Sequence, residues 1–89
     1  MNMTNDEIIE KIRTTLAEEF EIEIDLIQSE APLMQTLELD SLDLVDMVVL
    51  VEQNFGFNVT GQDFAGIKTF QDFYDLVITR MNEKANANG

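Results

Sequence analysis

Apolar residues recur at helical spacing in three long stretches of the chain, and polar turns separate these stretches. In the first stretch, one face carries Ile9, Ile12, Leu16 and Phe20. Just before it, Thr4 is followed three residues later by Glu7, the pattern of a capping box at a helix N-terminus. These signals predict a first helix over about residues 5–20.

A long connection follows this helix, and long connections in compact domains are often functional. Residues 21–26 alternate between polar and apolar like a short strand, but the sequence offers no second strand to pair with them. We therefore expect an extended loop that turns its apolar side chains inward, namely Ile22, Ile24 and Leu26. Further on, Leu33 and Leu37 are expected to pin the connection to the core.

The second long stretch predicts a helix that begins at Asp40 and Ser41, with Asp40 as the N-cap, and ends just before Gly56. A short third helix is expected over residues 62–65. The last helix is expected to follow Thr69, which would cap it. Its buried face should carry Phe70, Phe73, Val77 and Met81, with Tyr74 and Leu76 beside that face.

These elements predict a single all-α domain over residues 1–89. Its architecture would be a four-helix bundle with three main helices, one short third helix and a long first loop. The ordered core is expected over about residues 5–81. Residues 82–89 end in small and polar side chains and are expected to form a flexible tail.

Composition excludes several classes of function. The 89 residues include no cysteine and no histidine, so the chain lacks a thiol nucleophile and the usual general base near neutral pH. We therefore expect no catalytic residue, no metal site and no enzymatic activity. The 18 acidic and 5 basic residues give a net charge of −13, which repels nucleic acid and anionic membranes and attracts basic protein surfaces.

The sequence contains no stretch that could span a bilayer. The densest apolar run, residues 42–51, is too short and is interrupted by Asp43 and Asp46. Residues 1–7 lack the basic and apolar regions of a signal peptide. We therefore expect a monomeric protein of the cytoplasm.

The same apolar run has more hydrophobic residues than one buried helix face requires, since eight of its ten residues are apolar. Leu42, Val45 and Val49 would form one stripe, bordered by acidic side chains. These acids are Asp40, Asp43, Asp46 and Glu52. Two interpretations remain open: the stripe is a docking surface for basic partners, or the helix is central and buried on most sides.

Ser41 stands at the predicted start of this helix, next to the long connection. As a nucleophile it would lack a base, because the chain has no histidine. A serine in this place can simply cap the helix. It can also be a modification site, because the positive end of a helix favours a phosphodiester.

The segment resembles the acyl carrier proteins, whose hallmark Asp-Ser-Leu stands here as Asp40, Ser41 and Leu42. The resemblance extends over about residues 6–81 and continues through Asp43, Val45, Asp46, Glu52, Phe55, Val59 and residues 67–69. It implies that Ser41 receives 4′-phosphopantetheine from coenzyme A and that modifying enzymes recognise Asp40. The arm would supply the thiol that this cysteine-free chain lacks.

The resemblance also implies a surface for partners and a cavity for cargo. Partner enzymes would contact Leu42, Asp43, Val45, Asp46, Val49 and Glu52, and Ile67 would lie near the entrance of an acyl cavity. The expected partners are a phosphopantetheinyl transferase and the acyl-transferring and chain-extending enzymes of fatty-acid or specialised polyketide-like synthesis. These enzymes would carry basic patches.

Three departures from the family are informative. Glu38 stands where most relatives have glycine, so its backbone is either strained at positive φ or follows another path. The short third helix keeps one acid, Asp63, which would weaken partners that read acids there. Phe64 is large for its place and would either contact partners or narrow the cavity. The departures favour a carrier for a specialised pathway as a second interpretation.

Three alternatives stand beside an acyl carrier, one of them within the carrier class. A peptidyl or aminoacyl carrier also uses a modified serine, but such carriers tend to be less acidic. An unmodified acidic adaptor could dock through the second helix without any arm. A calcium-binding module would need a central glycine in its loop, and residues 40–46 have none.

Overall fold

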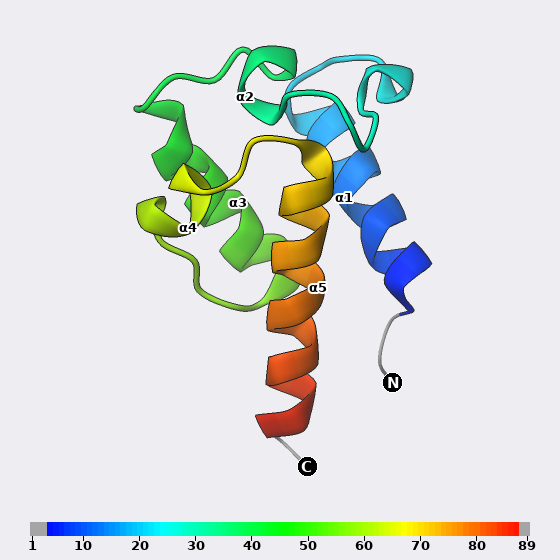
Figure 1. The fold of residues 1–89 in the computed structure, drawn as a ribbon, viewed down its shortest axis with the longest axis vertical. Helices are drawn as coiled ribbons and strands as arrows, with labels where there is room; N and C mark the ends of the chain where they lie inside the picture. The colour runs from blue at the N-terminus through cyan, green and yellow to red at the C-terminus, as the bar shows by residue number, and fades with distance from the viewer. Residues whose placement is uncertain (1–3, 88–89) are drawn as a thin grey trace.

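The computed structural model describes residues 4–87, which form three long helices and two short ones joined by loops (Figure 1). The helices are α1 (Asn5–Glu19), α2 (Leu33–Thr36), α3 (Asp43–Phe55), α4 (Gly61–Ala65) and α5 (Phe70–Ala87), with a 3₁₀ turn, η1 (Ile24–Leu26). Helix α5 lies between α1 on one side and α3 and α4 on the other, and the connection with α2 crosses the end where α5 begins. The predicted all-α bundle is confirmed.

The buried face of α1 agrees with the prediction at Ile12 and Leu16 and differs from it at Ile9 and Phe20. Ile8 is 2% exposed and lies with Ile12 and Leu16 in the core, whereas Ile9 and Phe20 are only partly buried. Two adjacent isoleucines fit the helical spacing equally well, so the pattern alone could not separate them.

The first connection is more structured than the extended loop we expected. Leu33 and Leu37 are buried as predicted, but they belong to a short helix: Leu33 begins α2, directly after Pro32, and Leu37 caps its end. The prediction for Leu26 is wrong, since its side chain is 54% exposed and the next residue, Ile27, is buried instead. The 3₁₀ turn causes this change, because its side chains repeat every three residues and not every two as in a strand, so Ile27 follows Ile24 on the same side.

Hydrogen bonds hold this connection against α1 and α5. The Arg13 guanidinium donates to the carbonyl oxygens of Ile24 and Ile27, both at 3.1 Å. At the other end, the Phe70 N–H donates to the Ala31 carbonyl at 3.2 Å. The connection is therefore tied down at both ends although it contains little regular structure.

Helix α5 supplies the centre of the core. Phe70, Phe73 and Val77 are buried as predicted, and Met81 is partly buried. Tyr74 was expected beside this face but is 1% exposed, so that prediction is wrong. The helix also continues to Ala87, beyond the expected end of the ordered core, and residues 88–89 of the predicted tail lie outside the described residues.

Three helix starts carry a carboxylate three residues after the capping residue, and the turn before α3 has the same arrangement. The pairs are Thr4–Glu7, Asp40–Asp43, Thr60–Asp63 and Thr69–Asp72. In each, backbone N–H groups donate to side-chain oxygens, as in a capping box, and the predicted cap Thr69 is confirmed. Backbone donation holds the pKa values of Glu7, Asp63 and Asp72 below their usual range.

Glu38 has a φ of 54°, so the first of its two predicted alternatives, a backbone strained at positive φ, is confirmed. It follows the C-cap of α2 in a Schellman motif. The Leu39 N–H donates to the Met34 carbonyl at 2.8 Å and the Glu38 N–H to the Gln35 carbonyl at 3.2 Å. Glycine suits this position because it has no Cβ to clash in the left-handed region.

Replacing Glu38 with glycine is therefore expected to raise the free energy of unfolding by about 1 kcal/mol. Urea denaturation followed by circular dichroism would measure the change. Glu30→Gly is the matched control, because Glu30 is also exposed but is not at positive φ. It should destabilise by adding freedom to the unfolded chain. Equal effects of the two substitutions would contradict the strain at residue 38.

The hydroxyl of Tyr74 is buried and has no hydrogen-bond partner among the described residues. Burial raises the pKa of this phenol, against the nearby positive charge of Arg13. Tyr74→Phe removes the unpaired group and is expected to raise the free energy of unfolding by about 1 kcal/mol at neutral pH.

The pH dependence offers a second readout for Tyr74, the only tyrosine in the chain. In the unfolded chain the phenol ionises near pH 10, whereas in the folded state its pKa is higher. Stability of the parent should therefore fall as the pH rises above about 10, and this fall should be smaller in Tyr74→Phe. Thermal melts between pH 8 and 11 would test this expectation, and parallel curves would contradict it.

Candidate functional site

Ser41 lies in a turn that leads into α3. The Asp40 carboxylate accepts hydrogen bonds from the N–H groups of Leu42 at 2.9 Å and Asp43 at 3.1 Å. The Asp43 carboxylate accepts in return from the Asp40 N–H at 3.0 Å. The prediction of Asp40 as the N-cap is therefore wrong: the regular helix begins at Asp43, with Leu42 as its N-cap, because this reciprocal pair holds residues 40–42 as a turn.

The turn presents the Ser41 side chain to solvent. No other described residue forms a hydrogen bond with its hydroxyl, so the oxygen is accessible to a modifying enzyme. Beside Ser41 is an apolar hollow of about 350 Å³ between α3 and the start of α4. It is lined by Ser41, Leu44, Val45, Val48, Val59, Thr60 and Gly61. A serine-linked group could place an apolar chain here.

Ile67 lies elsewhere. It is 8% exposed and lines a different hollow of about 380 Å³, together with side chains of α4 and α5. The structure therefore does not bring Ile67 and Ser41 to the same hollow, and a place for Ile67 near a cavity entrance remains a prediction.

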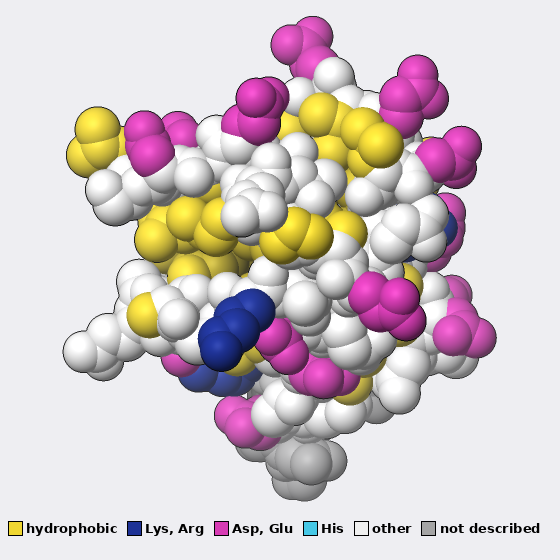
Figure 2. All heavy atoms as spheres, turned by 45° about the horizontal axis from the view of Figure 1, so that its top comes forward, with side chains coloured by type: hydrophobic (Ala, Val, Ile, Leu, Met, Phe, Trp, Pro, Cys, Tyr) yellow, Lys and Arg dark blue, Asp and Glu magenta, His cyan; other side chains and the backbone are white. Residues whose placement is uncertain are grey.

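The outer face of α3 carries the predicted apolar stripe. Leu42 is 79% exposed, Val45 64% and Val49 45%, whereas the opposite face of the helix is buried. The interpretation that α3 is buried on most sides is therefore wrong. Asp40, Asp46 and Glu52 are exposed near the stripe and Asp43 is half-buried. Figure 2 shows carboxylates spread over one face of the molecule, with hydrophobic side chains exposed between them.

Three of the five basic side chains are used inside the fold. Lys11 donates to the Asn54 carbonyl at 2.6 Å, near the end of α3, and lies 5.0 Å from the centre of the Phe55 ring. Arg13 holds the first connection, as described above. Arg80 donates to the Asn58 carbonyl at 3.1 Å and to Asp63 at 2.9 Å. These cations therefore hold loops and helix ends in place.

The two residues of α4 singled out from the sequence, Asp63 and Phe64, both make contacts within the domain. Phe64 is 3% exposed and its ring centre is 5.8 Å from that of Phe73, so the interpretation of Phe64 as a partner contact is wrong. Asp63 caps the helix and forms an ion pair with Arg80. The backbone hydrogen bond from Thr60 and the charge of Arg80 both hold the pKa of Asp63 low. Neither residue is free to meet a partner.

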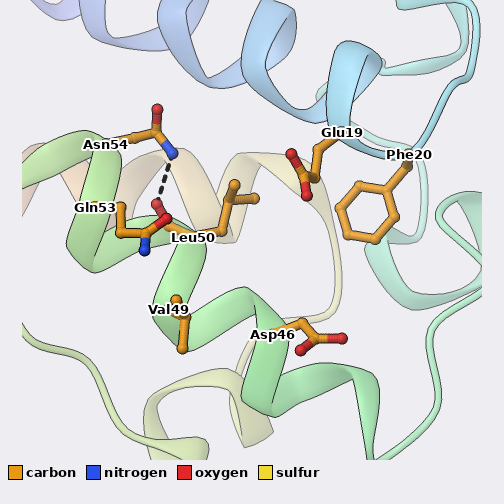
Figure 3. A pocket seen from close by; sticks show the side chains of 7 residues that line it. All are labelled: Glu19, Phe20, Asp46, Val49, Leu50, Gln53 and Asn54. Atoms are coloured by element: carbon orange, nitrogen blue, oxygen red, sulfur yellow. Dashed lines mark hydrogen bonds between the residues drawn. The ribbon is translucent and has the colours of Figure 1, made fainter.

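A groove between the end of α1 and the outer face of α3 was not predicted (Figure 3). Glu19 and Phe20 line it from α1, and Asp46, Val49 and Leu50 are among the residues that line it from α3. Helical spacing predicted Phe20 on the buried face of the first helix, so its position in an open groove was not expected.

Neither a membrane-spanning helix nor a cluster of metal-ligating side chains is found among the described residues. No helix within residues 4–87 is both long enough and apolar enough to cross a membrane. Over the same part of the chain, no group of three or more acidic side chains is placed to hold a metal ion.

Comparison with known proteins identifies the class. Residues 10–77 match the sequence profile of the family described as phosphopantetheine attachment site. This match covers well over half of the chain, and the chain belongs to the acyl carrier protein family. Proteins of this family are carriers without catalytic activity that bear a covalently attached 4′-phosphopantetheine.

Individual relatives agree with this assignment. The chain is 34% identical to an acyl carrier protein of Coprothermobacter proteolyticus, over 92% of this chain and 100% of the relative. It is 35% identical to one of Saccharopolyspora erythraea, over 97% of this chain and 90% of the relative. A third, from Thermosynechococcus vestitus, is 29% identical over 84% of this chain and 93% of the relative.

Proposed function

We propose that this acyl carrier protein bears its phosphopantetheine arm on Ser41 and presents acyl groups to partner enzymes. The exposed Ser41 side chain, at the start of α3 beside an apolar hollow, carries the proposal. The residues fit the group, because the hydroxyl is accessible and the hollow is open to solvent. When attached, the arm supplies the thiol that holds cargo as a thioester.

Other residues have separate roles in this proposal. Asp40 fixes the turn that holds Ser41 outward. Val48 and Val59 give the hollow apolar walls that shelter cargo from water. Ile67 would lie near a deeper cavity if α4 shifts to admit a longer chain, because it now lines a separate hollow.

The proposed partners dock on the exposed stripe of α3. They are a phosphopantetheinyl transferase and acyl-transferring or chain-extending enzymes of fatty-acid or specialised polyketide-like synthesis, with basic surfaces. Leu42, Val45 and Val49 would contact apolar residues of these enzymes, and the acids Asp40, Asp43, Asp46 and Glu52 would attract their cations. We also propose that the carrier works in the cytoplasm as a monomer, since its charge keeps copies apart.

Intact mass spectrometry tests the attachment site. The chain is incubated with coenzyme A and a broad-specificity phosphopantetheinyl transferase. We expect a mass gain of one phosphopantetheinyl group in the parent and none in Ser41→Ala. Ser29→Ala is the matched control, because Ser29 is also an exposed serine but lies in the first connection, and it should gain the full mass.

A mass gain in Ser41→Ala would place the arm elsewhere. If the folded parent gains no mass with two different transferases, the unmodified acidic adaptor replaces the carrier as the leading hypothesis. Loading the modified chain with an acyl group or an aminoacyl group by the corresponding loading enzymes would separate an acyl carrier from a peptidyl carrier.

A further inference from the structure

The groove between α1 and α3 lies directly beside the apolar stripe of α3. It has a volume of about 430 Å³ and contains Val49, which also belongs to the stripe. In Figure 3, Glu19 and Phe20 extend from the end of α1 toward α3. A protein that covers the stripe would therefore also cover the mouth of this groove.

The lining of the groove has a definite chemistry. Phe20, Val49 and Leu50 provide apolar walls, while Glu19 and Asp46 place one exposed carboxylate on each helix. No lysine or arginine is among the residues that line it. A long side chain with an aliphatic stem and a cationic head matches both features, because the stem packs on the walls and the head meets the carboxylates.

The position of the groove along α3 favours, as its partner, an enzyme that acts on Ser41. Asp46 is in the first turn of α3, which begins two residues after Ser41. The Asp46 end of the groove is therefore the end nearer to Ser41 along the chain, where an enzyme acting on Ser41 would approach. On the other side of α3, Asp63 is already paired with Arg80, so α4 offers less to an approaching cation.

We propose that the groove receives a lysine or arginine side chain from the basic surface of the phosphopantetheinyl transferase that modifies Ser41, with Glu19 as an anchor on α1. This inference rests on the proposed function of Ser41. It extends the docking surface away from α4 and onto the first helix.

Steady-state kinetics of arm transfer test the proposal. Glu19→Lys should raise the KM of a phosphopantetheinyl transferase for the carrier about ten-fold, with little change in kcat, because binding is weakened and the reacting atoms are untouched. Glu18→Lys is the matched control. It makes the same charge change one residue earlier on α1, at an exposed position outside the groove lining.

Long-range attraction alone would raise the KM equally in the two variants, and that result would overturn the proposal. A larger effect of Glu19→Lys that persists at 0.3 M salt supports it, because contact pairs are screened less than distant charges. Circular dichroism would verify that both variants are folded. Failure of the parent itself to accept the arm would instead contradict the proposed function, so the two failures are distinguishable.

Discussion

A lysine in place of Val45 is expected to lower kcat/KM for modification of Ser41 by about 100-fold while the domain stays folded. Val45 is 64% exposed at the middle of the α3 stripe, so the substitution removes little buried surface from the fold. In a complex with a basic enzyme, the same lysine would lose an apolar contact and place like charges together, which costs about 3 kcal/mol. Transferase kinetics would measure the loss.

Leu26→Lys is the control for this prediction. Leu26 is 54% exposed and apolar, but it lies in η1 and not on the stripe. The same added charge should therefore change kcat/KM only a few-fold, through the long-range field. If the two variants lose activity to the same extent, net charge and not the stripe determines docking.

Phe64→Ala is expected to lower the free energy of unfolding by about 3 kcal/mol or more, as large apolar truncations in a core do. Phe64 is 3% exposed and packs on Phe73, so it is the main apolar anchor that α4 makes with α5. A domain of this size has little stability in reserve, so a sizeable part of the population should unfold on mild warming. Thermal and urea denaturation would measure the change.

The control for this change is Phe57→Ala, which removes the same ring from a partly buried position. Its effect should be clearly smaller, since less buried surface is lost. A loss below about 1 kcal/mol in Phe64→Ala would mean that α4 opens independently of the core. Because α4 forms one wall of the hollow beside Ser41, that outcome would also describe a mobile wall at the cargo site.

The sequence predicted the long helices and the exposed stripe because their signals are local. Helical spacing, capping pairs and Gly56 at the end of α3 each act within a few residues. For Glu38, the choice between a strained backbone and another backbone path was recognised only because most relatives have glycine at this position. A second glutamate, Glu21, also has a φ of 54°, just after the end of α1. No feature of the sequence predicted its positive φ.

Errors arose where neighbouring residues are chemically alike and only tertiary contacts choose between them. Ile8 took the core position expected for Ile9, and Ile27 took the position expected for Leu26. At the second pair, Arg13 of α1 binds the carbonyl oxygens of Ile24 and Ile27, a tertiary contact that residue spacing cannot reveal. The groove at Glu19 escaped prediction because it forms only when two separate helices pack together.

The inward use of Lys11, Arg13 and Arg80 has a consequence for how a partner finds this carrier. These three cations are engaged in internal contacts, so they divide the acidic surface little. A basic enzyme would therefore be attracted to much of this surface, and the attraction would not direct it specifically to Ser41. The field speeds the first collision, and short-range apolar contact along α3 then selects the productive orientation. Most collisions would therefore be followed by a two-dimensional search over the surface of the carrier.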